Sequence, residues 1–263
     1  MSEGAQAGGS GRLTLVSWNI HSGIGTDGRF DLPRVAAVLE ALSPDITALQ
    51  EVGDFRGRTD AEAHPEWLAD RLGLHMAFGP NVVRGGRRYG NAVLTRLPIV
   101  RSRNYDLSVA DREPRGALRT DLSLGEGRRL HLFCLHLGLG LGERRQQASL
   151  LLSADILRDA VRRDPTLVCG DFNHWWSTPV RGLVRRALND AGTLLGRTVR
   201  TYPSRCPVLR LDRVYVDGGV LPLSLDSDRG SPARRASDHL PLVLRFAVRE
   251  EGATPPHPVL LHG

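Results

Sequence analysis

The feature that most constrains the fold is a set of four strand-like runs with no helical segment between them. They occupy residues 90–96, 98–105, 117–124 and 129–137. Consecutive strands joined without a crossover helix pair antiparallel, because a parallel pair needs a connection of a dozen or more residues, usually a helix. We therefore expect antiparallel sheet in the middle of the chain.

Helix-like segments lie on both sides of these runs. Residues 31–42 predict a helix in which Asp31 caps the N-terminus and Pro33 occupies the first turn. Further helices are predicted at 62–73, 143–163 and 180–188, and further strands at 13–20, 45–51, 166–170, 211–216 and 241–248. The apolar face of the 143–163 helix is expected to include Leu150, Leu157 and Val161.

This order of elements predicts one α/β domain with mixed sheets and helices on their outer faces. We place the domain at residues 12–248, between a flexible tail at 1–11 and a loose tail at 249–263. Periodicity does not determine the order of the strands within the sheets.

The composition describes a globular chain with no run of 18 apolar residues, and the first twelve residues lack the blocks of a signal peptide. Three widely spaced cysteines without metal-ligand spacing (Cys134, Cys169 and Cys206) suggest reduced thiols, so we expect a cytoplasmic protein. The net charge of +6 permits an anionic substrate. Because all 35 basic residues are arginine, this charge is weak support for DNA in particular.

Polar side chains recur where the apolar runs stop. In the run LVCGDFN, Asp171 and Asn173 are two residues apart and would lie on the same side of a strand. Other run ends carry Asn19, His21, Glu51, His136, Asp212, Asp238 and His239. Carboxylate and amide oxygens with few thiols suit Mg²⁺, for which Mn²⁺ could substitute. With histidines nearby to move protons, this set is typical of phosphate-ester hydrolysis.

The motifs around these residues are WNI at 18–20, LQE at 49–51, YGNAVLTR at 89–96, GDFN at 170–173, LDRVYV at 211–216 and SDHLP at 237–241. Together, and in this order, they resemble the endonuclease/exonuclease/phosphatase superfamily of metal-dependent phosphoesterases, which includes deoxyribonucleases and sphingomyelinases. The resemblance covers roughly residues 12 to 248. It implies a four-layered α/β sandwich of two packed, mainly antiparallel sheets flanked by outer helices.

The resemblance also implies roles for the metal and the attacking water. Glu51 looks like the principal metal ligand, with Asn19 beside it, and Asp238 would hold a second metal or a bridging water. Asp171 would orient or deprotonate the water, and Asn173 would stabilise the charged transition state.

By the same resemblance, His239 looks like the catalytic histidine with Asp212 as its orienting carboxylate. His136 would contact phosphate or assist the leaving group. His21 stands where AP endonucleases carry an aspartate, which argues against that branch and leaves the number of metals open.

Three residues are candidates for binding substrate: Arg115, Asn91 and His21. The alternative for Arg115 is a surface ion pair with Glu113. The arginines in residues 84–88 fit either a solvated hairpin or a phosphate-gripping loop.

We expect an Mg²⁺-dependent hydrolase acting on a phosphodiester, with a nuclease or general phosphodiesterase ranked first. A phospholipid- or inositol-phosphate-directed enzyme ranks second, and a catalytically silent binding module is the remaining alternative. The partner is a phosphate-ester substrate, nucleic acid being one candidate, and no obligate protein partner is evident. Membrane contact is suggested only by Trp175 and Trp176.

Overall fold

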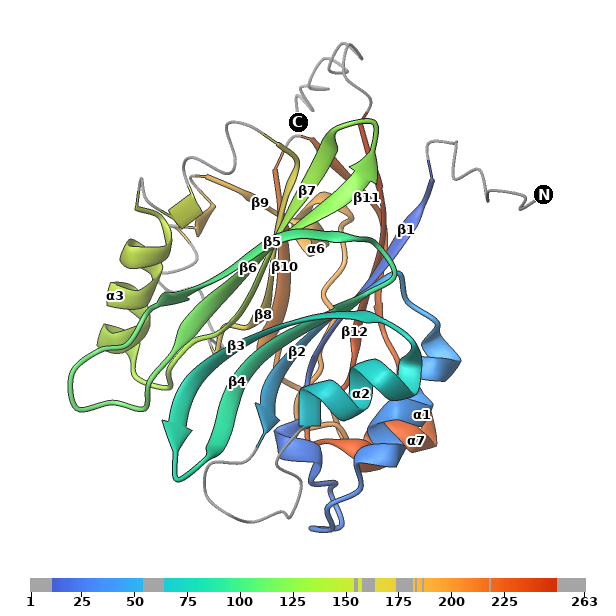
Figure 1. The fold of residues 1–263 in the computed structure, drawn as a ribbon, viewed down its shortest axis with the longest axis vertical. Coiled ribbons are helices and arrows are strands. Elements are labelled where there is room, and N and C mark those ends of the chain that lie inside the picture. Colours follow the sequence, from blue (N-terminus) through green and yellow to red (C-terminus); the bar gives the residue numbers. More distant parts are fainter. Residues whose placement is uncertain are drawn as a thin grey trace.

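The computed structural model describes residues 11–53, 64–153, 156–157, 164–173, 182, 184–185, 187–217 and 219–249. Two six-stranded sheets form its centre (Figure 1). The first has the order β11 (Val220–Ser227), β12 (Leu242–Val248), β1 (Leu13–Asn19), β2 (Ile46–Gly53), β4 (Arg87–Thr95) and β3 (His75–Arg84). The second has the order β5 (Ile99–Asp106), β6 (Gly116–Gly125), β7 (Arg128–His136), β8 (Thr166–Asp171), β10 (Asp212–Val216) and β9 (Asn189–Asp190).

The helices lie outside the sheets, except for the short α6 (Ala191–Leu194), which contacts β10 and β11 and contributes Ala191 to the apolar cluster between the sheets. They are α1 (Leu32–Leu42), α2 (His64–Leu72), α3 (Leu141–Leu151), α6 (Ala191–Leu194) and α7 (Ser231–Ala236), with a 3-10 turn, η1 (His21–Gly23). As the sequence predicts, the Asp31 side chain caps α1, accepting the N–H of Arg34, and a proline occupies its first turn. Among the described residues, no helix is long and apolar enough to cross a membrane.

Three apolar clusters separate four layers. The central cluster lies between the sheets and contains Leu15, Val93, Leu132 and Val214. A second cluster packs α1, α2 and α7 against the outer face of the first sheet, and a third packs α3 against the second sheet. The observed architecture is therefore the four-layered sandwich that the motifs predict, with α1, α2 and α7 on one flank and α3 on the other (Figure 1).

Each sheet contains one parallel pair near its middle. β1 runs parallel to β2, and β7 runs parallel to β8, while the remaining described pairs are antiparallel. The carboxyl ends of paired parallel strands meet at one edge of a sheet. This geometry brings the ends of β1 and β2, and separately those of β7 and β8, side by side.

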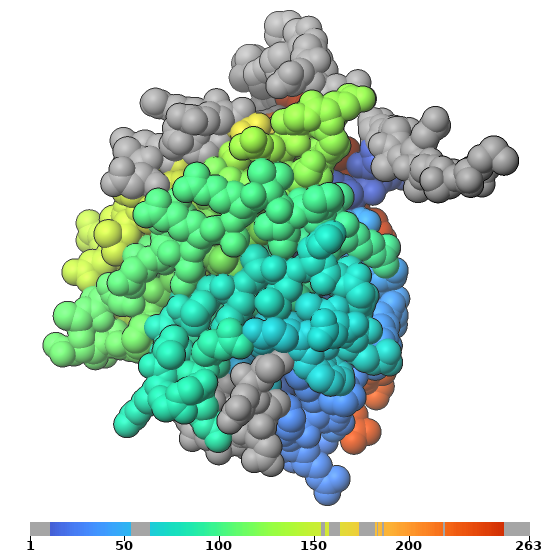
Figure 2. Space-filling model, in the orientation of Figure 1, coloured from blue at the N-terminus to red at the C-terminus, as the bar shows by residue number. Residues whose placement is uncertain are grey.

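The predicted antiparallel pairing of consecutive strands is confirmed for β5 with β6 and for β6 with β7. It is wrong for β4 and β5, which do not pair. β4 and β5 follow each other in sequence, yet β4 lies in the first sheet and β5 in the second. The two sheets meet at the neighbouring edge, where the Asn104 amide on β5 donates to the Pro80 carbonyl oxygen on β3 at 3.2 Å. Figure 2 shows these two strand regions packed directly against each other.

Other details of the predicted elements differ. Strands β3 and β11 were not predicted. Leu150 was expected on the buried face of its helix, but it is exposed, and the neighbouring Leu151 and Ala148 are buried instead. Leu157 is buried as expected. Val161, Trp175, Trp176 and much of the predicted 180–188 helix lie outside the described residues, as do nearly all of the two tails. Cys134 and Cys169 are buried free thiols, as expected, whereas Cys206 is exposed.

Gly170 is required by the close parallel packing of β7 and β8. Its φ is +140°, and a Cβ atom there would lie 1.9 Å from the carbonyl oxygen of Leu135. We expect Gly170→Ala to lower the free energy of unfolding by more than about 2 kcal/mol, because the backbone must shift. Urea unfolding followed by circular dichroism measures this.

Gly142→Ala is the matched control. Nothing lies within 4 Å of a Cβ built at this position in α3. An alanine there should stabilise the helix by up to about 1 kcal/mol. Equal unfolding midpoints for the two variants would contradict the steric account of Gly170.

Candidate active site

The strand ends from both sheets surround one cavity of about 320 Å³. It lies between the carboxyl ends of the two parallel pairs and the segments leading into β10 and β12. Eight of its lining residues were predicted from sequence: His21, Glu51, Arg115, His136, Asp171, Asn173, Asp238 and His239. Four were not: Tyr89, Glu113, Leu139 and Leu211. Tyr202 also lines it and begins the arginine-bearing loop at 202–210, which in the sequence fits either a wall of the substrate pocket or a structural brace.

The side-chain amide of Asn19 joins the two sheets at this cavity. Its Nδ2 donates to Glu51 Oε1 at 2.9 Å and to Asp171 Oδ2 at 3.2 Å. Glu51 comes from β2 of the first sheet and Asp171 from β8 of the second. Two carboxylates from different sheets are therefore held against one neutral donor.

β1 and β8 end in the same local turn. The Asn19 Oδ1 accepts the N–H of His21, and the Asp171 Oδ1 accepts the N–H of Asn173 at 2.9 Å. In both turns the side chain of one residue binds the backbone two residues on, which allows the latter a positive φ. The φ values are 47° at His21 and 49° at Asn173.

Glu51 reaches the cavity through a β-bulge. The register between β2 and β4 shifts between Leu49 and Val52, and Glu51 has a φ of 56°. A bulge adds a residue to one strand and re-aims the side chains beside it. A left-handed backbone at a residue other than glycine costs about 1–3 kcal/mol. Three cavity residues, His21, Glu51 and Asn173, carry this strain.

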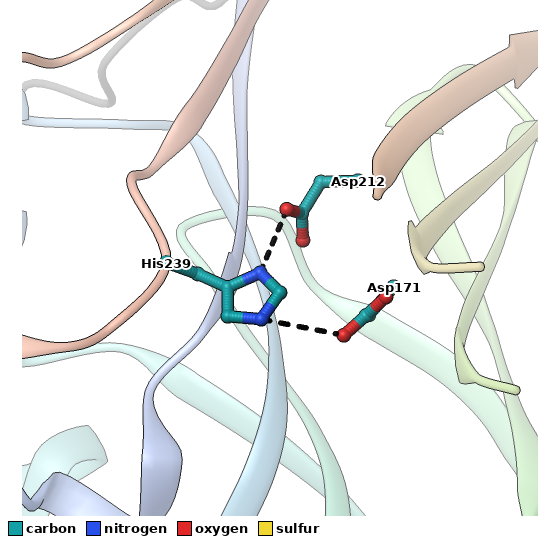
Figure 3. A group of neighbouring side chains, drawn as sticks. All are labelled: Asp171, Asp212 and His239. Atoms are coloured by element: carbon teal, nitrogen blue, oxygen red, sulfur yellow. Dashed lines mark hydrogen bonds and ion pairs between the residues drawn. The ribbon is translucent and has the colours of Figure 1, made fainter. Parts of the chain in front are cut away.

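His239 lies between two aspartates (Figure 3). Its Nδ1 is 2.9 Å from Asp212 Oδ2, and its Nε2 is 3.6 Å from Asp171 Oδ2. Asp171 and Asp212 face each other directly across the antiparallel β8–β10 pair. Like charges at facing positions repel, so an imidazolium between them lowers the energy of both.

The histidine loop is tied to β1. The indole Nε1 of Trp18 donates to the His239 carbonyl oxygen at 2.9 Å, and the Ser237 hydroxyl donates to the Asn19 carbonyl oxygen at 2.7 Å. These bonds place the ring of His239 against the strand end that carries Asn19.

The pKa values follow from burial and these charges. Burial would lower the pKa of His239, but Asp212 and Asp171 together outweigh it and raise that pKa to about 10. Burial is the largest cause of the raised pKa of Asp171, the positive charge of His239 opposes it, and the Asp212 carboxylate adds to it. At neutral pH His239 is therefore a cation beside a carboxylate that takes up a proton more readily than usual.

His136 is the second buried histidine of the cavity and has the opposite character. Burial, followed by the positive charges of Arg115 and His239, lowers its pKa well below the ordinary value, so it is neutral. Its Nε2 accepts the Asn173 amide at 3.0 Å, which leaves the ring proton on Nδ1, 4.0 Å from Glu51 Oε1. Asp171 Oδ2 is 3.6 Å from His136 Nε2 as well.

Arg115 is 7% exposed and lines the cavity beside His136. One guanidinium nitrogen donates to Glu113 Oε1 at 2.8 Å, so the ion pair named as the alternative does form. The same nitrogen lies 3.4 Å from His136 Nδ1. The ion pair thus holds the guanidinium at the cavity instead of out on the surface.

Asn91 and Asn19, both predicted from the sequence, are buried and are not among the residues that line the cavity. Asn91 is buried opposite the β2 bulge and does not line the cavity; its amide donates to the carbonyl oxygens of Gly116 and Cys134 in the other sheet. Asn19 accepts the backbone N–H of His21 with its amide oxygen and donates from its amide nitrogen to Glu51.

The structure also locates Asp238, a predicted metal ligand, and the arginine-rich hairpin at residues 84–88. Asp238 Oδ1 lies 3.9 Å from His21 Nδ1 at the cavity rim. In the hairpin, Arg88 pairs with Glu66 at 2.7 Å and stacks over Phe78, which matches a structural role for that arginine.

The donor set fits a divalent cation. Glu51 presents a partly exposed carboxylate in the cavity, and only oxygen and nitrogen donors surround it among the described lining residues. Such oxygen donors suit Mg²⁺ or Mn²⁺. Asp171, Asp212 and His239 also lie close enough to share an ion, but Asp212 and His239 already bind each other. Glu51 is therefore the better candidate ligand.

The fold and the site define a class: a two-sheet sandwich with an acid–histidine cavity at its strand ends. Residues 16–239 match the model of the endonuclease/exonuclease/phosphatase family. The chain belongs to this family.

The chain is also similar to a curated protein and to several solved structures. The uncharacterized protein YbhP of Escherichia coli K12 is 36% identical over 247 residues, which cover 87% of this chain and 93% of YbhP. An endonuclease/exonuclease/phosphatase from Beutenbergia cavernae superposes with a TM-score of 0.72 at 22% identity, covering 90% of this chain and 72% of that one. The human Nocturnin catalytic domain, solved with a sulfate anion, superposes with a TM-score of 0.71 at 23% identity. The match covers 90% of this chain and 95% of that one. These two likenesses show the fold.

Sequence reasoning missed four lining residues. Tyr89 and Leu211 lie inside quoted motifs, YGNAVLTR and LDRVYV, which could have signalled them. Glu113 and Leu139 lie in loops, and the path of a loop depends on contacts made far along the chain, as the loop of Tyr202 illustrates. The Tyr202 ring lies 4.9 Å from the His239 ring, although 37 positions separate them (239 − 202).

We expect Asp212→Asn to lower the pKa of His239 from about 10 toward its ordinary value of 6.5, because the nearest carboxylate is lost. The folded-state pKa lies above the unfolded one, so the stability from this pairing is present below about pH 6.5 and is lost as the pH rises toward 10. The stability gap between wild type and variant should narrow across that window. Titration of the histidine ring by NMR in EDTA, with urea unfolding at each pH, measures both.

The exposed Asp226, which pairs with Arg197, provides the control. Asp226→Asn should leave the titration of His239 unchanged. An unaltered titration in Asp212→Asn would instead show that Asp212 does not hold the proton on the imidazole.

Proposed function

We propose that this protein is a metal-dependent hydrolase of phosphate esters, in which water attacks phosphorus directly. The observation that carries the proposal is the placement of His239 between Asp171 and Asp212 at a cavity that Glu51 also enters. Membership of the family supports hydrolysis of phosphate esters. The domain performing it spans residues 12–248 in this proposal.

Asp171 is the base for the attacking water. Its raised pKa makes it a better proton acceptor near neutral pH than an ordinary carboxylate. Its Oδ1 is fixed by the Asn173 N–H, so Oδ2 is the atom that receives the proton. This Oδ2 lies 3.6 Å from both His239 and His136, and the two rings confine its position.

His239 acts as a cation toward the phosphate in this scheme. Asp212 holds the Nδ1 proton and fixes the ring, and Nε2–H, whose nitrogen lies 3.6 Å from Asp171 Oδ2, is the donor offered to a phosphate oxygen. A positive charge there opposes the negative charge that develops on phosphorus oxygens in the transition state. The Asn173 amide donates to His136 Nε2 and to the Leu137 carbonyl oxygen, so it fixes the His136 ring, and the neutral His136 adds an Nδ1–H donor that does not repel the phosphate.

A bound divalent cation would supply Lewis-acid polarisation of the phosphate. Glu51 would hold it, with Asn19 fixing the carboxylate and Asp238 available across the cavity. Mg²⁺ is our proposed ion, with Mn²⁺ as a substitute. Arg115, held by Glu113, would grip a non-bridging phosphate oxygen.

We expect EDTA to abolish hydrolysis and Mg²⁺ or Mn²⁺ to restore it. His239→Ala and Asp171→Asn should each lower kcat by at least about 10²-fold, because each removes a group that acts on the proton or the developing charge. The assay uses plasmid DNA, single-stranded DNA, RNA, phospholipids, inositol phosphates and a chromogenic phosphodiester.

Asp226→Asn, which alters a remote exposed carboxylate, is the control for protein quality and contaminating nucleases. Full activity in His239→Ala, from preparations with native circular dichroism, would overturn the mechanism. Binding of a phosphate ester without turnover by wild type would identify the silent binding module instead.

A further inference from the structure

A second hollow lies next to the catalytic cavity. It is a groove of about 870 Å³ between the β5–β6 connection (residues 107–115) and the outer face of α3. Both segments lie on the same flank of the molecule (Figure 1). Its walls include Val109 and Ala110 on one side and Gly142, Ser149 and Leu150 on the other.

The groove shares both walls with the catalytic cavity. The β5–β6 connection contributes Ala110 to the groove and, three residues on, Glu113 to the cavity. The segment after β7 contributes Leu139 to the cavity and, three residues on, Gly142 to the groove. Three residues along each of these segments thus separate the lining of the cavity from the lining of the groove.

Three leucines in the segment after β7 and in α3 have exposed side chains. Leu139 is 73% exposed, Leu141 53% and Leu150 43%. They belong to the run LGLGLG at 137–142 and to α3, where neither a cap nor a turn requires leucine. Large exposed leucines gathered beside a binding cavity mark a surface that is covered when a ligand binds.

The chemistry of the groove selects among ligands. Arg145 is the one charged side chain among the described residues that line it, and none of those residues is aromatic. A groove for a nucleic-acid strand would combine several cations with aromatic platforms for the bases. The remaining lining residues are uncharged: Val109, Ala110, Gly142 and Leu150 are small or apolar, and Ser108, Gln146, Ser149 and Ser153 are polar. An uncharged groove of small side chains and leucine fits a flexible aliphatic chain, and Arg145 is available to an anionic group.

We propose that this groove is a subsite for the aliphatic chain of a lipid-like phosphate ester whose phosphate occupies the catalytic cavity. The proposal rests on the proposed function and narrows its substrate class from phosphate esters in general to those that carry an alkyl or acyl chain. It favours the alternative that ranked second on sequence grounds over nucleic acid.

Binding of alkylphosphonates tests the groove without requiring turnover, because their carbon–phosphorus bond is not hydrolysed. We expect octylphosphonate to bind wild type with Mg²⁺ at least about tenfold more tightly than butylphosphonate, since burial of two of its four additional methylenes suffices for that factor. Isothermal titration calorimetry below the micelle concentration measures both ligands.

Leu150→Glu places a carboxylate in the groove, and Ser149→Trp fills it without adding charge. Both should reduce the octyl-to-butyl preference to less than about twofold while leaving butylphosphonate binding unchanged. Leu194→Glu is the matched control, since Leu194 is an exposed leucine (54%) on α6 and does not line the groove. It should retain the full preference.

Hydrolysis of butyl and octyl p-nitrophenyl phosphate separates this inference from the proposed function. Faster turnover of the octyl ester by wild type, lost in both groove variants, supports the subsite. Equal turnover and equal binding of the two chain lengths would overturn the groove while leaving the proposed function standing. No turnover of either ester or of any substrate in the panel above overturns the proposed function alone, and calorimetry then decides the groove. A preference that survives in both groove variants would also overturn the subsite.

Discussion

One amide group, the side chain of Asn19, joins the two halves of the site. It donates to Glu51 from one sheet and to Asp171 from the other, so the spacing of these carboxylates depends on how the two sheets pack. The central cluster of leucine and valine between the sheets sets that packing. The catalytic geometry is thus a direct product of the apolar core, and changes of core volume near the strand ends are transmitted to it.

Much of this site was predictable because strand periodicity and strand ends are local properties. Asp171 and Asn173 were expected on one side of a strand. β8 ends at Asp171, and the two residues lie together because they share a turn in which Asp171 Oδ1 accepts the Asn173 N–H. Eight predicted residues line one cavity because both parallel pairs end on the same side. The four-layered arrangement itself was implied by the resemblance of the motifs and not by periodicity.

The remaining features depend on contacts between distant parts of the chain. β4 and β5 are consecutive in the chain but belong to different sheets. The two sheets meet where the Asn104 amide donates to the Pro80 carbonyl oxygen. Asn91 looks like a site residue in its motif, yet its amide satisfies two carbonyl oxygens of the facing sheet. Leu150 matches the apolar spacing of a helix, but the adjoining residue takes the buried position. In that last case the mismatch itself points to the groove.

The left-handed backbone at His21, Glu51 and Asn173 has a consequence for how such a protein changes over time. Glycine would relieve the strain at each of these positions, although it would remove the side chain from the cavity. Stability and function therefore pull in opposite directions at the same three residues. Selection for thermal stability alone would replace these residues with glycine and leave a stable protein without its site. Selection for function is what retains them.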